Sequence, residues 1–312
     1  MRRKYILTVA LALLINSLAY GKDDGELVDS KKYIHREILP DPGSKSCPEI
    51  PVTLTQVSGN LYRHTKGGAY SGFVLITKDG ALVIDPAQTC TAIRLRDEIK
   101  SRFHTSVKYV VYTHAHFDHI GGGQVFQKDG ATIVAHRNAV EPIVGEKLPT
   151  AVPDRTFEKD MKIELGDEIV ELHYVAPSHS NSLALVYFPK YKALQCTDVC
   201  GADSLPFNEL PDFYYEGWIE TLKWIQTLDV EVVDTGHRSP GTKAQQRALM
   251  EYMQDLHEQV LSLVRKGEPW DQIYRDIKFK DEYKKWSGYD NMRILNVLGM
   301  YRWVNSHRRG VW

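Results

Sequence analysis

The chain has 312 residues, of which 43% are hydrophobic, 25% charged and 10% aromatic. This is ordinary globular composition, so disorder and fibrous repeats are excluded for most of the chain, and the length allows one large domain or two small ones. Lys and Arg number 39 against 40 Asp and Glu, a formal net charge of −1. A general polyanion binder would need a basic surface, so this balance argues against nucleic acid as a partner.

Residues 1–21 have the pattern of a secretory signal peptide. Three positive residues at positions 2–4 precede an apolar run over 5–20, and Ala19 and Gly21 are the small residues expected before a cut at Lys22. The run is short for a membrane span, although an uncleaved anchor is the alternative. We therefore expect a periplasmic or secreted protein with no membrane attachment after cleavage, which removes three positive charges and no negative ones.

Four cysteines are present, and an exported protein can keep them oxidised. Four in a chain of this size do not make a disulfide framework, because the hydrophobic core can support itself. A bridge between Cys47 and Cys90 is possible, but pairing cannot be deduced from sequence. Cys196 and Cys200 have the spacing of a metal-binding pair, but no second pair accompanies them, so this signal is weak.

The elements expected in the first half alternate between strands and helices. Residues 22–51 are polar and irregular, which indicates an N-terminal extension on the surface. Strands follow from Val52, including a hairpin of 73–77 and 81–85 around Asp79 and Gly80. A helix with apolar residues at 95, 99 and 103, a buried strand over 107–112, a short helix over 121–127 and a strand over 131–135 come next.

The second half repeats this alternation. Strands are predicted over 169–175, 184–188, 193–197 and 230–234, with a helix over 216–228 between the last two. A long helix over 245–264 and a helical tail from Gly267 complete the chain. This order of elements predicts a layered α/β sandwich with the sheets inside.

One segment carries most of the chemical information. It reads Thr-His-Ala-His-Phe-Asp-His over residues 113–119 and directly follows the buried strand over 107–112. Imidazole and carboxylate groups suit zinc or iron. His114 and His116 project to one side of an extended segment. Asp118 and His119 come after the chain turns, so they can face a second ion. A polar loop with chance histidines is improbable at this density.

Three further ligand-type residues lie next to predicted strands later in the chain. His179 lies in a turn between two strands, Asp198 follows the strand over 193–197, and His237 follows the strand over 230–234. Loops at strand ends commonly build functional sites. Each residue alone would be an ordinary loop residue, but their shared placement favours a common site.

These residues resemble the metal-binding motifs of the metallo-β-lactamase fold superfamily. His114, His116, Asp118 and His119 match its H-x-H-x-D-H signature, and the three later residues follow in the expected order. Asp85 matches an early acidic residue that usually supports the ligands. The resemblance covers residues 52–265 and implies an αββα four-layer sandwich with the metals at one edge of the sheets, followed by a C-terminal helical extension over 266–312.

The resemblance also implies which residues hold which ion. One ion would be held by His114, His116 and His179, the other by Asp118, His119 and His237, with Asp198 bridging both. Members that use a cysteine ligand have it where Asp198 stands, so this chain is more similar to the glyoxalase II-like and lactonase-like members. It departs from the usual motifs at Asn181, Ser182 and Thr197, which bears on substrate class more than on metal binding.

We therefore predict an exported hydrolase with two Zn²⁺ ions, iron or manganese being possible, that attacks a small-molecule carbonyl bond with a metal-bound hydroxide. Two adjacent ions lower the pKa of a shared water toward 7, and Asp118 is the candidate catalytic residue that shuttles its proton. A β-lactam, lactone or thioester is the expected substrate. The alternatives are sulfate or phosphate ester hydrolysis, a sulfur dioxygenase-type iron oxidoreductase, or a non-catalytic module that keeps a metal for stability.

Other residues near these motifs favour ordinary structural roles. His136 is expected to make helix-start hydrogen bonds, His173 to lie within a strand and Cys196 to pack beneath the site. Residues 65–71 could form a flap beside the metals or a plain hairpin loop, and Tyr214, Tyr215 and Trp218 could line the pocket or pack helices. The C-terminal helices could cover the pocket or form a homodimer contact.

Overall fold

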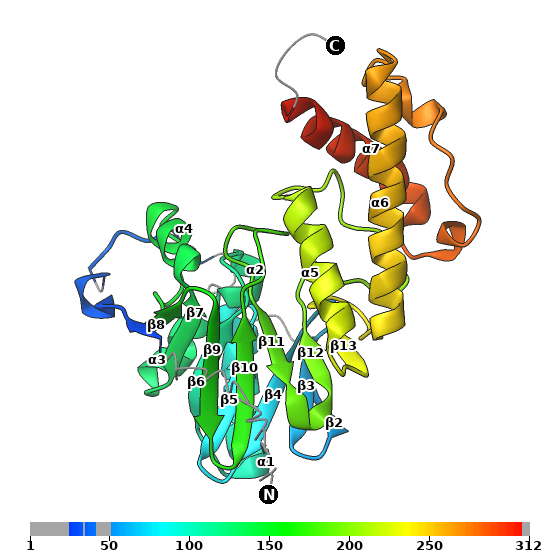
Figure 1. Ribbon diagram of the computed structural model, residues 1–312. Coiled ribbons are helices and arrows are strands. Elements are labelled where there is room, and N and C mark those ends of the chain that lie inside the picture. Colours follow the sequence, from blue (N-terminus) through cyan, green and yellow to red (C-terminus); the bar gives the residue numbers. More distant parts are fainter. Residues whose placement is uncertain (1–24, 34, 42–50, 308–312) are drawn as a thin grey trace, which may run out of the picture.

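The computed structural model describes residues 25–33, 35–41 and 51–307, so the predicted signal peptide lies outside the described residues. Two β-sheets pack face to face between layers of helices (Figure 1). The strands of the first sheet, in chain order, are β1 (Glu26–Leu27), β2 (Val52–Ser58), β3 (Leu61–Lys66), β4 (Tyr70–Thr77), β5 (Gly80–Ile84), β6 (Val107–Tyr112), β7 (Thr132–His136) and β8 (Arg155–Phe157). Their spatial order is β1-β8-β7-β6-β5-β4-β3-β2.

In the first sheet, strand pairing changes from antiparallel to parallel at β5. Strands β2 to β5 form an antiparallel meander, whereas β5 to β8 run parallel to one another. The parallel strands are connected through helices α1 (Thr89–Phe103), α2 (Phe117–Ile120), α3 (Gly123–Lys128) and α4 (Val140–Gly145). Because parallel strands end at the same edge of a sheet, the residues that follow β5 and β6 meet there.

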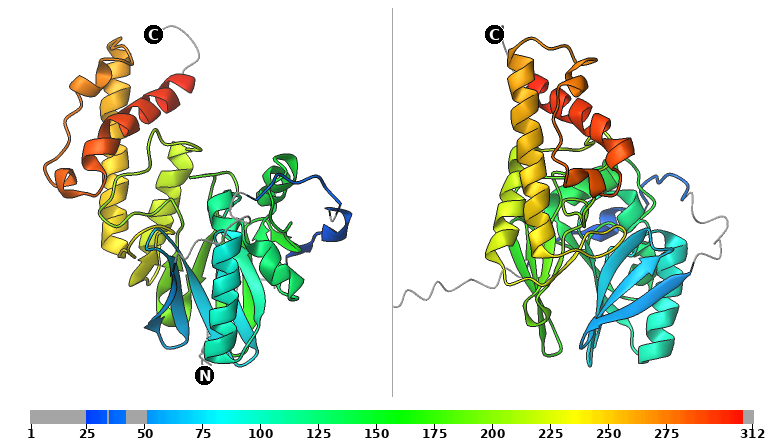
Figure 2. Two further views of the ribbon diagram at one scale, coloured as in Figure 1. Left: turned by 180° about the vertical axis from the view of Figure 1, so that it is seen from behind. Right: turned by 90° about the vertical axis from the view of Figure 1, so that its right-hand side faces the viewer.

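The second sheet consists of β9 (Asp160–Leu165), β10 (Glu168–His173), β11 (Leu185–Phe188), β12 (Ala193–Gln195) and β13 (Val232–Asp234), in the order β13-β12-β11-β10-β9. It is antiparallel except for the parallel pair β12 and β13. That pair is connected through α5 (Tyr215–Thr227). The edge-on view in Figure 2 places α1 outside the first sheet and α5 outside the second, with α6 (Lys243–Arg265) beside it.

Three hydrophobic clusters correspond to the three interfaces between these four layers. Strand β4 shows why: Phe73 and Leu75 belong to the cluster between the sheets, while Val74 belongs to the cluster under α1. Successive side chains of a strand point to opposite faces, so a strand covered on both sides is apolar throughout. The third cluster joins the second sheet to α5, α6 and the C-terminal helix α7 (Tyr289–Ser306). The predicted αββα sandwich is thus confirmed.

The elements differ from the predicted ones in a few places. The short strands β8 and β9 were not anticipated, and α6 begins at Lys243 because Thr242 and Gln245 form a capping box. The predicted C-terminal helical tail is present but interrupted: Gly267, at φ 84°, follows the end of α6, and the chain forms 3-10 helices at Ile273–Arg275 and Tyr283–Lys285 before α7. The other 3-10 helices are Ser30–Tyr33, Arg137–Ala139 and Pro189–Tyr191. Within the described ranges, the helices are all too short or too polar to cross a membrane.

Candidate metal centre

The seven predicted ligands converge at one edge of the two sheets. His114 and His116 follow β6, and Asp118 and His119 lie in α2, which starts after His116. The other three come from the second sheet: His179 lies between β10 and β11, Asp198 follows β12, and His237 follows β13. Two groups of these residues each place their ligand atoms within 4.8 Å of one another: His114, His116, His179 and Asp198 in the first, and Asp118, His119 and His237 in the second.

The first group is centred on one oxygen of Asp198. Asp198 Oδ2 lies 3.4 Å from His114 Nε2 and 3.5 Å from His179 Nε2. His179 Nε2 also lies 3.1 Å from His116 Nδ1. The first group therefore presents three imidazole nitrogens and a carboxylate oxygen to a common point, a donor set that suits a divalent transition metal.

The second group is connected to the first through the same carboxylate. Asp198 Oδ1 lies 3.0 Å from His237 Nε2, and Oδ2 lies 3.1 Å from His119 Nε2. Asp118 Oδ2 is 3.5 Å from His119 Nε2 and is more exposed than the other ligands. Asp198 thus contacts members of both groups, in agreement with the bridging position that the sequence resemblance implies.

The protonation of the histidines tests whether this donor set fits a metal. His114 Nδ1 lies 3.0 Å from the Thr113 hydroxyl, while the buried Nε2 has no hydrogen-bond partner. Burial holds the pKa of His114 well below its usual range, and the neighbouring His116 and His119 lower it further. Burial likewise lowers the pKa of His179 to about 4. Both rings are therefore neutral near pH 7, with a nitrogen lone pair available to an ion.

His119 and Asp198 behave as a charged pair in the metal-free protein. Burial acts to lower the pKa of His119, but the carboxylates of Asp198, Asp118 and Asp85 outweigh it and raise the pKa to about 10. Burial acts to raise the pKa of Asp198, but the charge of His119 and the hydrogen bonds from His119 and His237 hold it well below its usual range. A metal ion would have to replace the proton of His119.

Asp85 supports the centre from beneath. Its carboxylate accepts hydrogen bonds from the Thr113 amide at 2.8 Å and hydroxyl at 2.6 Å, and from the Thr197 hydroxyl at 3.1 Å. Asp85 Oδ2 also lies 3.9 Å from His119 Nδ1. Burial raises the pKa of Asp85 to about 6 although His119 and these hydrogen bonds oppose the shift. Thr197, one of the positions at which the sequence departs from the expected motifs, therefore has a specific partner in this chain.

A second buried carboxylate organises the turn that carries His237. Asp234 Oδ1 accepts hydrogen bonds from the Ser71 hydroxyl at 2.7 Å and the Gly236 amide at 2.8 Å, and Arg63 donates to Oδ2. Arg63 and Ser71 belong to β3 and β4 of the first sheet, so these bonds join the two sheets beside the centre. The end of the β3–β4 hairpin lies here too, because Tyr70 forms an isolated β-bridge with His237.

The residues near the motifs for which the sequence favoured structural roles have identifiable contacts. His136 caps the 3-10 helix that follows it, accepting from the Asn138 amide at 3.3 Å, and its Nε2 lies 2.8 Å from the Glu158 carbonyl, as expected. Cys196 and Cys200 form a disulfide, so the weak metal-pair interpretation is wrong: each sulfur is bonded to the other. Cys90 also has no free thiol, but Cys47 lies outside the described residues.

Sequence reasoning missed Asp212, whose Oδ2 lies 3.1 Å from His116 Nε2. Asp212 lies in an irregular loop between Asp198 and α5, where no motif or periodicity marks it. Trp218, which was left between two roles, packs in the third hydrophobic cluster and lies with its ring centroid 6.1 Å from that of His179.

Two sheets between helices, with two adjacent groups of histidine and aspartate at one edge, define a class of metal-dependent protein. The model of the metallo-beta-lactamase superfamily matches residues 65–237, and this chain belongs to that superfamily. This assignment supports a metal-dependent hydrolase as the general class.

Relatives of this chain within the superfamily are named for different activities. The alpha subunit of 2,4-dinitroanisole O-demethylase from Nocardioides sp. (strain JS1661) is 27% identical over 211 residues, 65% of this chain and 63% of the relative, so the chain spans less than two thirds of that relative's length. A metallo-beta-lactamase type 2 from Bacillus cereus is 25% identical over 204 residues, 62% of this chain and 78% of the relative.

Solved structures share the fold. A metallo-beta-lactamase from Pontibacter korlensis superposes with a TM-score of 0.57 at 24% identity, over 65% of this chain and 99% of that one. A double mutant of the sec-alkyl sulfatase PisA1 superposes with a TM-score of 0.70 at 17% identity, over 82% of this chain and 51% of that one. The second similarity extends over more of this chain than the first.

Proposed function

We propose that this protein is an exported hydrolase that uses two zinc ions to cleave a carbonyl bond in a small molecule, with a β-lactam or another cyclic amide or ester as the first substrate class to test. The position of Asp198 carries the proposal. Its carboxylate lies within 3.5 Å of nitrogens in both ligand groups, so one side chain can join two adjacent ions.

The proposed ligands divide as the geometry groups them. His114, His116 and His179 would hold one ion, and Asp118, His119 and His237 the other, with Asp198 shared. When bound, such a pair of ions would lower the pKa of water enough to supply a hydroxide nucleophile near neutral pH.

Asp118 is the proposed proton carrier. Its side chain is 40% exposed, whereas that of His119 is 1% exposed, so Asp118 can reach solvent and substrate while it contacts the centre. A carboxylate in this position can orient the attacking water, accept its proton at Oδ and deliver that proton to the departing atom. Asp85 and Thr113 would hold the buried histidines in a fixed orientation.

The β3–β4 hairpin supports a substrate with an acidic group. The Tyr70 ring lies 5.0 Å from the His237 ring, and the Lys66 ammonium lies 5.4 Å from the centre of the Tyr70 ring. Burial lowers the pKa of Lys66, while Asp118 opposes the shift. A cation beside the second ligand group would attract a carboxylate or sulfate on the substrate.

Export is a separate part of the proposal. The positive residues at 2–4, the apolar run after them and the small residues before Lys22 support it. The Cys196–Cys200 disulfide also supports an oxidising compartment, since such bonds are rare in the cytosol. Mass spectrometry of protein recovered from the expression host, with its N-terminal residue determined, would test the cut before Lys22.

Sulfate-ester hydrolysis is the second candidate. The fold similarity to the alkyl sulfatase reaches 82% of this chain, against 65% for the metallo-beta-lactamase from Pontibacter korlensis, so it extends further along the chain. The ligand set also permits iron, and stoichiometric iron with oxygen consumption would favour an oxidoreductase over both hydrolases.

A hydrolysis panel tests the proposal. Purified protein of measured metal content is assayed against β-lactams, lactones, thioesters and sulfate esters, with and without a chelator. Turnover of one class that stops with chelator and returns with zinc is expected. Asp118→Ala, reloaded with zinc to the wild-type metal content before assay, should lower kcat by about 10²- to 10⁴-fold, whereas Asp79→Ala, in the exposed turn at the opposite end of β4, should have no effect. Unchanged activity in Asp118→Ala would contradict the assigned role.

A further inference from the structure

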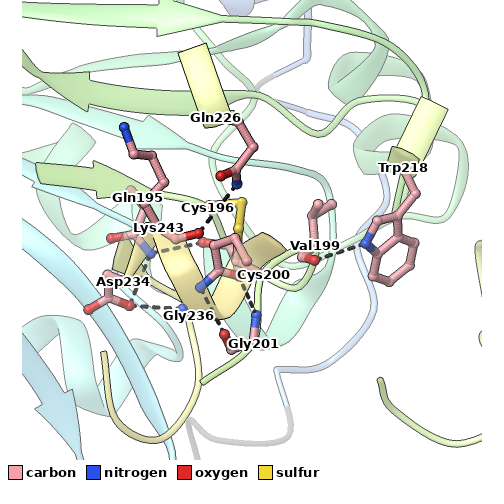
Figure 3. Close-up of a disulfide and its surroundings, with 12 residues drawn as sticks. Gln195, Cys196, Val199, Cys200, Gly201, Trp218, Gln226, Asp234, Gly236 and Lys243 are labelled. Atoms are coloured by element: carbon pink, nitrogen blue, oxygen red, sulfur yellow. Dashed lines mark hydrogen bonds between the residues drawn. A yellow bond between two sulfur atoms is a disulfide. The ribbon is translucent and has the colours of Figure 1, made fainter. Parts of the chain in front are cut away.

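A disulfide encloses the residue that joins the two ligand groups. Cys196 and Cys200 are bonded to each other across a sequence separation of 4, and Asp198 is the middle residue of the turn between them. Cys196 is fully buried and Cys200 nearly so. Figure 3 shows this disulfide with the backbone of Val199 and Gly201 beside it.

Asp198 has a backbone conformation that its neighbours must maintain. Its φ is 63°, in the left-handed region that side chains other than glycine rarely adopt. Its amide donates to the Thr235 carbonyl at 3.1 Å, and the Val199 amide donates to the Thr197 carbonyl at 2.8 Å. Such a conformation persists only where the surroundings restrict the alternatives, so the ends of this turn must be held in place.

Two helices hold the outer side of the same turn. The Trp218 indole of α5 donates to the Val199 carbonyl at 2.9 Å (Figure 3). The Gln246 side chain of α6 accepts from the Gly201 amide at 2.9 Å and donates to the Gly201 carbonyl at 2.8 Å. Both side chains are buried. These bonds hold the residues after Asp198, and the disulfide links them back to Cys196, which directly follows β12.

We propose that the Cys196–Cys200 disulfide is a positioning element for Asp198 that sets the metal affinity of the centre. This inference rests on the proposed function, since it takes Asp198 as a ligand shared by two ions. Without the disulfide, the left-handed turn has more conformations available, and the carboxylate spends less time between His119, His237 and the first group. Supporting groups of this kind typically change metal affinity by about 10- to 100-fold.

The test compares two pairs of cysteine substitutions in the full mature chain. Cys196→Ala/Cys200→Ala removes the proposed positioning element, and Cys47→Ala/Cys90→Ala is the matched control that leaves it intact. Zinc affinity is measured on metal-free protein by competition with a chromophoric chelator, and stability of the same samples by urea unfolding. We expect the affinity to fall at least about tenfold in the first variant and to stay within threefold of wild type in the control.

The outcomes separate positioning from simple stabilisation. Equal zinc affinities in both variants, with only the unfolding midpoint of the first one lowered, would overturn the inference. If the first variant does not fold, Cys200→Ser alone breaks the same disulfide at its less buried end and takes its place. The same fall of at least about tenfold in zinc affinity is then expected, and an unchanged affinity would overturn the inference. A wild-type protein that binds no zinc would instead contradict the proposed function.

Discussion

Asp212 Oδ2 lies 3.1 Å from Nε2 of His116, whose other nitrogen, Nδ1, lies 3.1 Å from His179 Nε2 within the first ligand group. Asp212 can therefore accept the Nε2 proton and leave Nδ1 free for an ion, which fixes the tautomer of the ring. The Asp212 loop is itself held by α7, because the buried Asn296 amide donates to the carbonyls of Pro206 at 3.0 Å and Asn208 at 2.7 Å. The C-terminal helix thus supports His116, a proposed ligand that comes from the other sheet.

Replacing Asp212 by Ala should weaken zinc binding by about tenfold. The reason is that His116 would lose the partner that orients its ring, while the exposed position of Asp212 predicts little change in stability. Chelator competition measures the affinity and urea unfolding the stability. Glu209→Ala, in the same loop, is the control. A variant with wild-type zinc affinity would show that the contact does not orient His116.

Zinc binding should release a proton near pH 7. The pKa of His119 is raised to about 10 in the metal-free protein, chiefly by Asp198 acting against the effect of burial. The ring is therefore charged at neutral pH and must lose a proton to bind an ion, so the affinity rises with pH up to about 10. Calorimetric titration with zinc in buffers of different ionisation enthalpy measures the number of protons released. A heat that is independent of the buffer would rule out a charged His119.

Removing the arginine that pairs with Asp234 should destabilise the protein. The Asp234 side chain is fully buried and that of Arg63 is 13% exposed, so Arg63→Ala would leave a buried carboxylate without its cation. We expect a loss of about 3 kcal/mol in the free energy of unfolding. Lys162→Ala, which breaks the exposed pair with Glu171, should cost less than about 1 kcal/mol. Urea unfolding of both variants tests this, and equal losses would contradict it.

The metal-free protein should lose stability between pH 6.5 and pH 4 in part because of His136. Burial, with a smaller effect from Arg137, lowers the pKa of His136 to about 4 from the ordinary 6.5. Above pH 6.5 the ring is neutral in both the folded and the unfolded chain, and its contribution is fully present. As the pH falls, the unfolded chain takes up the proton first, so folding weakens, by on the order of 3 kcal/mol by pH 4.

The variant His136→Asn isolates this contribution, since it cannot titrate in that range. It is expected to be less stable than wild type at pH 7, because the ring stacks on Tyr174 with centroids 3.8 Å apart. Its free energy of unfolding should nevertheless fall less steeply between pH 6.5 and pH 4. Parallel pH profiles for the two proteins would show that another group causes the dependence.

The local pattern of the sequence is sufficient to predict the main elements and the candidate ligands that the structure brings together. The side chains of strand β4 point alternately to two buried faces, which makes the strand recognisable as an apolar run. Residues 114–119 lie so close in sequence that a turn after β6 brings them together. His179, Asp198 and His237 could be predicted because each follows or precedes a strand, and the ends of neighbouring strands meet at one edge. Residues 266–288 were predicted less well, because short 3-10 helices have no periodicity to detect.

The contacts that orient the ligands depend on the tertiary structure. Along the chain, Asp212 is separated from His116 by strands β7 to β12, although the two side chains are in contact. Arg63 and Asp234 come from different sheets, and the sequence left more than one possible disulfide partner for Cys196. Spacing along the chain determines which side chains share a face of a strand or a turn of a helix. It does not determine which distant loops pack against each other, because that depends on how two sheets and their helices exclude water together.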